Sequence, residues 1–214
     1  MRYLLTPLFA SFAVVGWCGD FWDQKPPVEW SDTECARLLS DSPWAKPVKA
    51  SNELSGKLHA GASLNGGLSV GMGSRRNSDT NPEFTVTVRW ESAQPIREAS
   101  RRTSLGKPDR TYIISVTGLP IGADTVEPGN RPWTRVEERL RELTKITLKG
   151  GDELHPFLVV AGQEENVIYF YFSGEDAAIS ATTKEIGFVT QSGPLVFETK
   201  FVTKQMKYRG RAAL

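Results

Sequence analysis

Phe84–Glu91 reads FTVTVRWE, and this stretch decides the fold. Apolar and polar residues alternate along it, with Phe84 opening one face and Thr85 opening the other. A period of two is typical of a β-strand with one buried face and one polar face. The segment TYIISVTGL at 111–119 also has strand composition and ends in a Gly-Leu-Pro turn. The two segments predict the first strands of a β-rich domain.

Four further strands are predicted at 156–162, 166–173, 185–192 and 195–202. A polar Gln-Glu-Glu turn joins the first two and a Gly-Pro turn joins the last two, which indicates two hairpins. A final short strand at 207–213 would complete the sheet. Because strands and helices do not alternate regularly, we expect an α+β fold. It consists mainly of a sandwich-like antiparallel sheet with two or three short helices.

Two helices are predicted inside this domain. The segment 92–102 reads SAQPIREASRR and is expected to begin at Ser92, with the proline in its first turn. The segment 134–144 opens with Thr134 and Glu137 at the spacing of a capping box, in which each side chain bonds the other residue's backbone N–H. Its apolar residues recur on one helical face, and Glu and Arg alternate on the other.

The chain before the β-rich domain divides into two parts. Residues 17–50 contain one predicted helix at 31–40, which begins with a capping box of Ser31 and Glu34 and ends before Pro43. Residues 51–82 are rich in Gly, Ser and Asn and show no hydrophobic periodicity. That composition predicts a flexible linker leading to the β-rich domain at 83–214.

The first residues have the composition of an export signal. Residues 1–16 place a single Arg2 before an apolar run that ends in small residues, and a polar, proline-rich stretch follows. This pattern predicts a secretory signal peptide. The run is shorter than the roughly 20 residues that a bilayer-spanning helix needs. We therefore expect an exported protein, periplasmic or attached to a membrane.

Cys18 and Cys35 are the two cysteines of the chain. Cys18 lies where an acylated lipoprotein cysteine would lie, although bulky Trp17 replaces the small residue that normally precedes it. Acylation would give a stable anchor, because such a cysteine carries more than one chain. If Cys18 is retained without lipid, it could form a disulfide with Cys35 in an oxidising compartment. A free, buried Cys35 thiol is the alternative.

Composition excludes several classes of function. The 26 basic and 25 acidic residues give a formal net charge of +1, whereas nucleic-acid-binding domains are normally clearly basic. The two cysteines and two histidines reach the four ligands of a zinc site only if all of them join it. We therefore predict no nucleic-acid partner, no cofactor and no metal site, and assign no catalytic residue.

A hydrolase remains as an alternative. GLSVG at 67–71 matches the nucleophile-elbow pattern around Ser69, and Asp124 and His155 follow in the expected order. The flanks are rich in Gly and Asn, however, instead of forming the strand and helix that this motif requires. A glycosidase would need only two facing carboxylates, whose separation cannot be read from the sequence.

Two basic clusters have two interpretations. One comprises Arg97, Arg101, Arg102, Lys107 and Arg110, and the other comprises Lys200, Lys204, Lys207, Arg209 and Arg211. On a strand, Lys207, Arg209 and Arg211 would share one face, opposite Tyr208. They could contact an anionic envelope component or partner. Alternatively, they form a solvated strand whose charges block edge-to-edge pairing.

Three of the six tryptophans, Trp22, Trp30 and Trp44, lie close together near the mature N-terminus. Exposed rings could stack on sugars, which would indicate a carbohydrate-binding module. Packing of the N-terminal helix against the sheet explains the same residues.

Several segments in this order resemble a known family. They are WSDTECARLLSDSPWAK, a glycine-rich stretch, VRWESAQPIREA, YIISVTGLP, the helix leading to LHP, and the ending FETKFVTKQMKYRGRAAL. The set is similar to a family of uncharacterised, predicted exported bacterial proteins. The resemblance implies export and a single β-rich domain, and it implies no activity.

These observations favour an exported, non-catalytic binding or structural module of the envelope or periplasm, with an unidentified envelope component or protein as its partner. The alternatives are a secreted hydrolase, through Ser69 or a carboxylate pair, and a carbohydrate-binding module. Ser69 close to His155 would favour the hydrolase, and a row of exposed tryptophans would favour sugar binding.

Overall fold

Antiparallel strands are the most abundant secondary structure of the described chain. The computed structural model describes residues 20–52, 84–101, 110–121, 132–148, 151–162, 166–175, 179 and 183–214. Within them, one five-stranded sheet has the order β1-β3-β4-β8-β7 and a second has the order β2-β10-β9-β5-β6. The first sheet contains β1 (Ala45–Lys49), β3 (Thr85–Trp90), β4 (Thr111–Thr117), β8 (Val167–Ser173) and β7 (Leu158–Ala161). The second contains β2 (Ser51–Asn52), β10 (Leu195–Val202), β9 (Glu185–Ser192), β5 (Lys145–Leu148) and β6 (Glu153–Leu154).

The predicted α+β, mainly antiparallel fold is confirmed, as are both hairpins. β7 pairs with β8, and β9 pairs with β10 across the Gly-Pro turn. The strand β1 was not predicted from the sequence. It lies in the 17–50 segment and pairs with β3 through Ala45↔Arg89 to Lys49↔Thr85. Pro47 interrupts its apolar pattern, which an edge strand tolerates because one row of its backbone groups needs no partner.

The inner faces of the two sheets meet in an aromatic core. Trp90 on β3 packs edge-on against Phe201 on β10, with ring centroids 5.4 Å apart. Phe170 on β8 packs against Phe188 on β9 at 6.0 Å. All four rings are fully buried, and truncating one such ring costs about 3–5 kcal/mol. The alternation first seen in FTVTVRWE therefore places Val86, Val88 and Trp90 in the core between the sheets, whereas Phe84 at its start is exposed.

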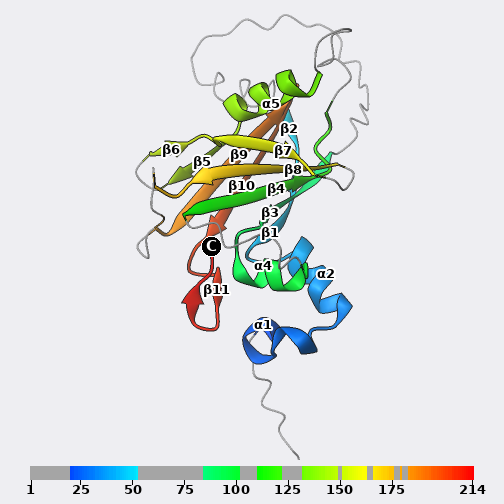
Figure 1. The fold of residues 1–214 in the computed structure, drawn as a ribbon, viewed down its shortest axis with the longest axis vertical. Helices are drawn as coiled ribbons and strands as arrows, with labels where there is room; N and C mark the ends of the chain where they lie inside the picture. Colours follow the sequence, from blue (N-terminus) through cyan, green and yellow to red (C-terminus); the bar gives the residue numbers. More distant parts are fainter. Residues whose placement is uncertain are drawn as a thin grey trace, which may run out of the picture.

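Five helical segments accompany the sheets in the described residues. They are α1 (Phe21–Gln24), the 3-10 turn η1 (Pro27–Glu29), α2 (Asp32–Ser40), α4 (Gln94–Ala99) and α5 (Pro132–Leu143). In Figure 1, α5 lies at one end of the molecule, whereas α1, α2 and α4 lie at the other.

Two predicted helix starts are wrong by one or two residues. α5 begins at Pro132, so Thr134 lies inside the helix instead of capping it. Proline suits the first helical position, because its missing N–H would be unpaired there in any case. α4 has Ala93 as its N-cap. The Ser92 hydroxyl, expected at the helix start, accepts a hydrogen bond from the Ile113 amide instead, at 3.3 Å.

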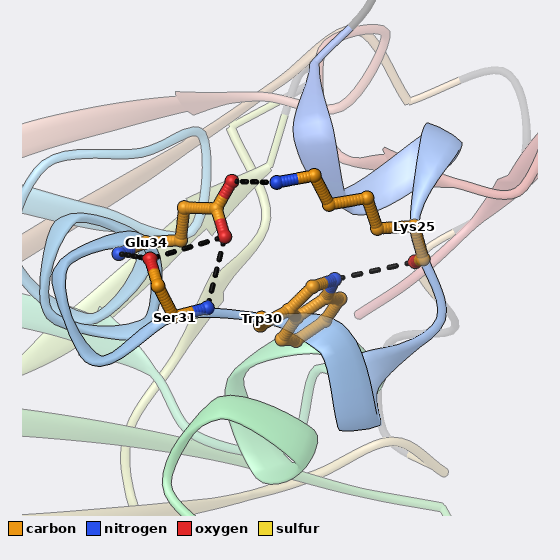
Figure 2. A network of polar contacts seen from close by, with 4 residues as sticks. All are labelled: Lys25, Trp30, Ser31 and Glu34. Carbon is orange, nitrogen blue, oxygen red and sulfur yellow. Dashed lines mark hydrogen bonds and ion pairs between the residues drawn. The ribbon is translucent and has the colours of Figure 1, made fainter.

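The predicted capping box of α2 is confirmed and extends into a larger polar network, shown in Figure 2. The Ser31 amide donates to Glu34 at 2.9 Å, and the Glu34 amide donates to the Ser31 hydroxyl at 3.2 Å. Lys25 adds an ion pair to Glu34 at 2.6 Å, and this bond lowers the pKa of the Glu34 carboxyl. The Trp30 indole donates to the Lys25 carbonyl at 3.2 Å. The network joins α2 to the turn before it.

The last predicted strand does not complete either sheet. Residues 207–212 form a separate hairpin of β11 (Lys207–Tyr208) and β12 (Arg211–Ala212). Arg209 and Gly210 form its turn, and both have positive φ, as the two central residues of a tight hairpin require. Lys207, Arg209 and Arg211 therefore do not share one strand face. The hairpin brings Arg211 directly opposite Tyr208.

Candidate functional site

A cleft of about 980 Å³ lies between α4, the start of β4 and the β11–β12 hairpin. Figure 1 shows α4 and β11 next to each other at the end of the molecule opposite α5. The walls combine backbone and apolar groups with a set of ionisable side chains: Arg97, Glu98, Arg110, Tyr112, Tyr208, Arg209 and Arg211. Its volume lies at the upper end of the range for small-molecule sites.

The cleft joins the two basic clusters of the sequence. Arg97 lies on α4, and Arg110 directly precedes β4. Arg209 and Arg211 lie on the hairpin. Among the side chains of the described lining, Glu98 is the one acid. The charge of the lining is therefore strongly positive, although the chain as a whole carries a formal charge of only +1.

The arginines of the cleft differ in how they are held. The Arg97 Nε atom is buried and has no hydrogen-bond partner among the described residues. The Arg209 guanidinium lies 5.0 Å from the centre of the Tyr208 ring, in cation–π contact. Arg110 contacts Glu175 at 3.3 Å, but both side chains are mostly exposed, so this pair is weak and easily exchanged.

Tyr208 is hydrogen-bonded to Glu98, the one acidic side chain of the lining. Its hydroxyl donates to Glu98 Oε2 at 2.5 Å, and Gln94 donates to Oε1 of the same carboxylate at 2.8 Å. Burial, followed by the bond to Glu98, raises the pKa of Tyr208 well above its ordinary value. The hydroxyl therefore remains a protonated donor. Both carboxylate oxygens of Glu98 thus accept a hydrogen bond from a neutral side chain.

Contacts with the N-terminal segment hold the hairpin in place. The Trp44 indole donates to the Ala213 carbonyl at 2.7 Å, and Asp23 accepts the Arg209 amide at 2.6 Å. The Trp30 ring meets the Tyr208 ring edge-on at 6.2 Å. These contacts join positions more than 160 residues apart, which explains why the sequence alone did not reveal the cleft.

The three N-terminal tryptophans pack into the core. Trp22, Trp30 and Trp44 are at most 5% exposed, and Trp22 meets Trp44 edge-on at 5.6 Å. The core-packing interpretation is therefore confirmed. Among the described tryptophans none is exposed, so they form no row on which a sugar could stack.

The second basic cluster separates into two groups. Arg209 and Arg211 line the cleft, but Lys200 lies on the second sheet and pairs with Glu185 at 3.0 Å. This ion pair raises the pKa of Lys200. Lys204 and Lys207 are exposed. Arg209 and Arg211 are exposed as well, so the solvated interpretation fits all four residues, and the two arginines in addition line the cleft.

Most other residues singled out from the sequence lie outside the described part of the chain. They include the leader at 1–16, nearly all of the 51–82 linker, Cys18, Ser69 and Asp124. His155 is described and exposed, between β6 and β7, and it does not line the cleft. Cys35 is a half-buried free thiol whose pKa is raised by burial. Its pairing with Cys18 stays a prediction.

The chain matches no protein-family model, and neither a curated protein nor a solved structure matches it. Within the described ranges, no helix has the length and apolar character to span a membrane. The same ranges contain no group of three or more His, Cys, Asp or Glu residues that could hold a metal ion.

Proposed function

We propose that this protein is an exported, non-catalytic binding module that holds an anionic component of the cell envelope in the arginine-lined cleft. The observation that carries the proposal is the convergence of Arg97, Arg110, Arg209 and Arg211 on one cleft from three separate segments. A concave site with charges of one sign concentrates ligands of the opposite sign and raises their rate of association.

The details of the cleft favour binding over catalysis. Tyr208 is held as a protonated donor, and Glu98 is bonded to two side chains. Neither group is therefore poised as a base or a nucleophile at neutral pH. Arginine guanidinium groups stay charged at all ordinary pH values and serve to recognise carboxylates and phosphates.

Binding is tested by calorimetric titration of the full chain with three anionic probes: alginate, pyrophosphate and vesicles containing phosphatidylglycerol. Dextran and phosphatidylcholine vesicles serve as counterparts without net charge. We expect at least one anionic probe to bind and its counterpart not to bind. Affinity should fall as salt rises, because screening weakens exposed charge interactions.

A matched pair of variants locates the binding. Arg209→Gln/Arg211→Gln removes two charges from the cleft, and Arg139→Gln/Arg141→Gln removes two charges at the same spacing from α5. The first variant should lose about tenfold or more in affinity, since charge-assisted hydrogen bonds are among the stronger polar contacts. The second should bind like the wild type. Equal affinity for both variants, or no binding of any anionic probe, would refute the proposal.

Export and attachment are a separate part of the proposal, supported by the composition of residues 1–16 and the position of Cys18. Intact mass of the protein from membrane and soluble fractions tests it. A mass matching a diacyl or triacyl addition at Cys18 identifies an anchored lipoprotein. A plain mass starting at Trp17 identifies a soluble exported form, and an uncleaved chain contradicts export by this leader.

A further inference from the structure

Four residues other than glycine have a left-handed backbone in the described part of the chain, and three of them are arginines. Arg101, Arg110 and Arg209 have φ angles of 54°, 60° and 51°, and Asn166 has a φ of 64°. In this conformation the Cβ atom of an ordinary side chain crowds the following carbonyl oxygen, so Gly and Asn are the residues that normally adopt it. The remaining left-handed positions of the described chain hold glycine. Arginine thus lies where the backbone favours another residue.

The fold gives little reason for an arginine at position 209. Arg209 and Gly210 are the central residues of the β11–β12 turn, where Asn followed by Gly is the favoured pair. The Arg209 amide donates to Asp23 at 2.6 Å, a bond that any residue with a backbone N–H could make. The guanidinium contacts the Tyr208 ring, but such a contact stabilises little at an exposed site. The side chain therefore does not offset the unfavourable backbone of Arg209.

The same holds for Arg110, whose backbone is fixed by close approach of the chain after β8. The Gly174 amide donates to the Arg110 carbonyl at 2.7 Å, and a Cβ atom on Gly174 would lie only 2.8 Å from that oxygen. These contacts involve no side-chain atom of Arg110. Its guanidinium pairs with Glu175 at 3.3 Å, and this pair contributes little because the two side chains are 74% and 69% exposed.

The side chains of Arg110 and Arg209 line the cleft and are exposed, so a ligand in the cleft can reach them. A residue that opposes the preference of its own backbone, without contacts that compensate, is expected at a functional site. We infer that Arg110 and Arg209 are the cleft residues that contribute most to binding the anion, although Asn at either position would make the fold more stable. This inference rests on the proposed function and identifies the residues on which it depends.

The first experiment measures affinity. Arg110→Asn and Arg209→Asn introduce a residue that tolerates the left-handed backbone. Arg101→Asn makes the same change, with the same loss of charge, at a residue that does not line the cleft. The full chain is titrated with pyrophosphate and alginate by calorimetry and with phosphatidylglycerol vesicles by co-sedimentation. For the probe that the wild type binds, each cleft variant should lose about tenfold in affinity, and Arg101→Asn should bind like the wild type.

Arg211 provides a comparison within the hairpin. It lines the cleft from β12 and does not have a left-handed backbone. Arg211→Gln should therefore weaken binding of the same probe less than Arg209→Asn does. An equal or larger loss for Arg211→Gln would overturn the special contribution of Arg209.

The second experiment measures stability by thermal unfolding without ligand, followed by circular dichroism. Arg110→Asn and Arg209→Asn should each unfold about 2 °C above the wild type, because they relieve an unfavourable backbone conformation. Asn166→Arg makes the reverse change at a left-handed residue that does not line the cleft. It should unfold about 2 °C below the wild type and bind the probe equally well.

The two measurements together can overturn the inference. Unchanged affinity in Arg110→Asn or Arg209→Asn overturns the role of that arginine. An equal loss of affinity in Arg101→Asn shows that binding follows net charge and not contact in the cleft. A lower unfolding temperature of both cleft variants shows that folding itself requires these arginines, which also overturns the inference. In each case, binding of an anionic probe by the wild type leaves the proposed function intact, whereas failure of every anionic probe overturns both.

Discussion

Both ends of the β-sandwich, α5 at one and the cleft at the other, carry several arginines. The acidic residues near these arginines are arranged differently at the two ends. On α5, Arg139 and Arg141 alternate with glutamates along one helix, so opposite charges recur three or four residues apart. At the cleft end, four arginines converge from three segments, and Glu98, the one acidic side chain of the described lining, is bonded to Tyr208. A net charge of +1 therefore hides a surface on which folding has separated the charges.

Arg89 shows how the chain neutralises an arginine inside the fold. Arg89 on β3 pairs with Glu91, which is 1% exposed, at 2.6 Å. The Ser115 hydroxyl donates to the same carboxylate oxygen at 2.7 Å, and Arg89 also donates to the Leu39 carbonyl of α2 at 3.3 Å. Where an arginine is structural, the chain thus supplies partners. The described residues offer the buried Arg97 Nε no such partner.

The largest loss of stability is expected when Arg89 loses Glu91, its ion-pair partner. Glu91→Gln keeps the shape of the side chain but leaves the Arg89 charge, whose side chain is 14% exposed, without its counter-ion. Breaking a buried pair in this way costs about 3–5 kcal/mol. We expect the lower part of that range because Arg89 keeps some contact with water. The free energy of unfolding in urea measures it.

The control replaces both members of the pair. Arg89→Met/Glu91→Leu removes both charges and should recover most of the lost stability, because hydrophobic replacement of a whole buried pair is often nearly neutral. A Glu91→Gln variant as stable as the wild type would show that Arg89 is compensated by other groups. The contrast between Arg89 and the cleft arginines would then disappear.

A smaller loss of stability is expected when the hydrogen bond between Tyr208 and Glu98 is removed. Tyr208→Phe removes the hydroxyl that donates to Glu98 at 2.5 Å. A hydrogen bond to a charged group contributes about 1.5 kcal/mol or somewhat more, and we expect the lower figure because Glu98 is half-buried and can bind water instead. Urea unfolding at neutral pH measures the loss.

The pH dependence of stability gives a second measure of the same bond. Folding raises the pKa of Tyr208 above its ordinary value of 10. Near and above pH 10, the Tyr208 hydroxyl therefore loses its proton in the unfolded chain but keeps it in the folded chain. The contribution of Tyr208 is therefore complete below pH 10 and is lost as the pH rises beyond it. Tyr208→Phe should make the fall in stability above pH 10 shallower. An identical fall in both proteins would mean that the Tyr208 hydroxyl is not buried against Glu98.

Local patterns predicted most strands and the capping box of α2, because both are encoded by neighbouring residues, whereas the capping box expected at Thr134 and Glu137 was wrong. The alternation in FTVTVRWE and the pairing of Ser31 with Glu34 both appear in the structure as expected. The cleft depends instead on contacts such as Trp44 to Ala213, which join distant positions. The charge pattern at 209–211 was predicted on a flat strand and lies instead in a hairpin, because the positive φ of Arg209 and Gly210 turns the chain. Arg209 and Arg211 are thus exposed, as expected, and also line the cleft.

The smallest expected changes in the free energy of unfolding have opposite signs at α5 and at the cleft. Arg141 on α5 lies four residues after Glu137, so Arg141→Gln removes a favourable pair and should destabilise the protein by about 0.3 kcal/mol. Arg211 lies among other arginines of the cleft, so Arg211→Gln relieves repulsion and should stabilise by a similar amount, about 0.3 kcal/mol, when no ligand is present. Replicate urea unfolding in low salt measures both changes. High salt should shrink both, because it shortens the distance over which charges interact. Destabilisation by both variants would show that the cleft arginines are compensated like those of α5, and would contradict the unmatched positive charge on which the proposed anion binding depends.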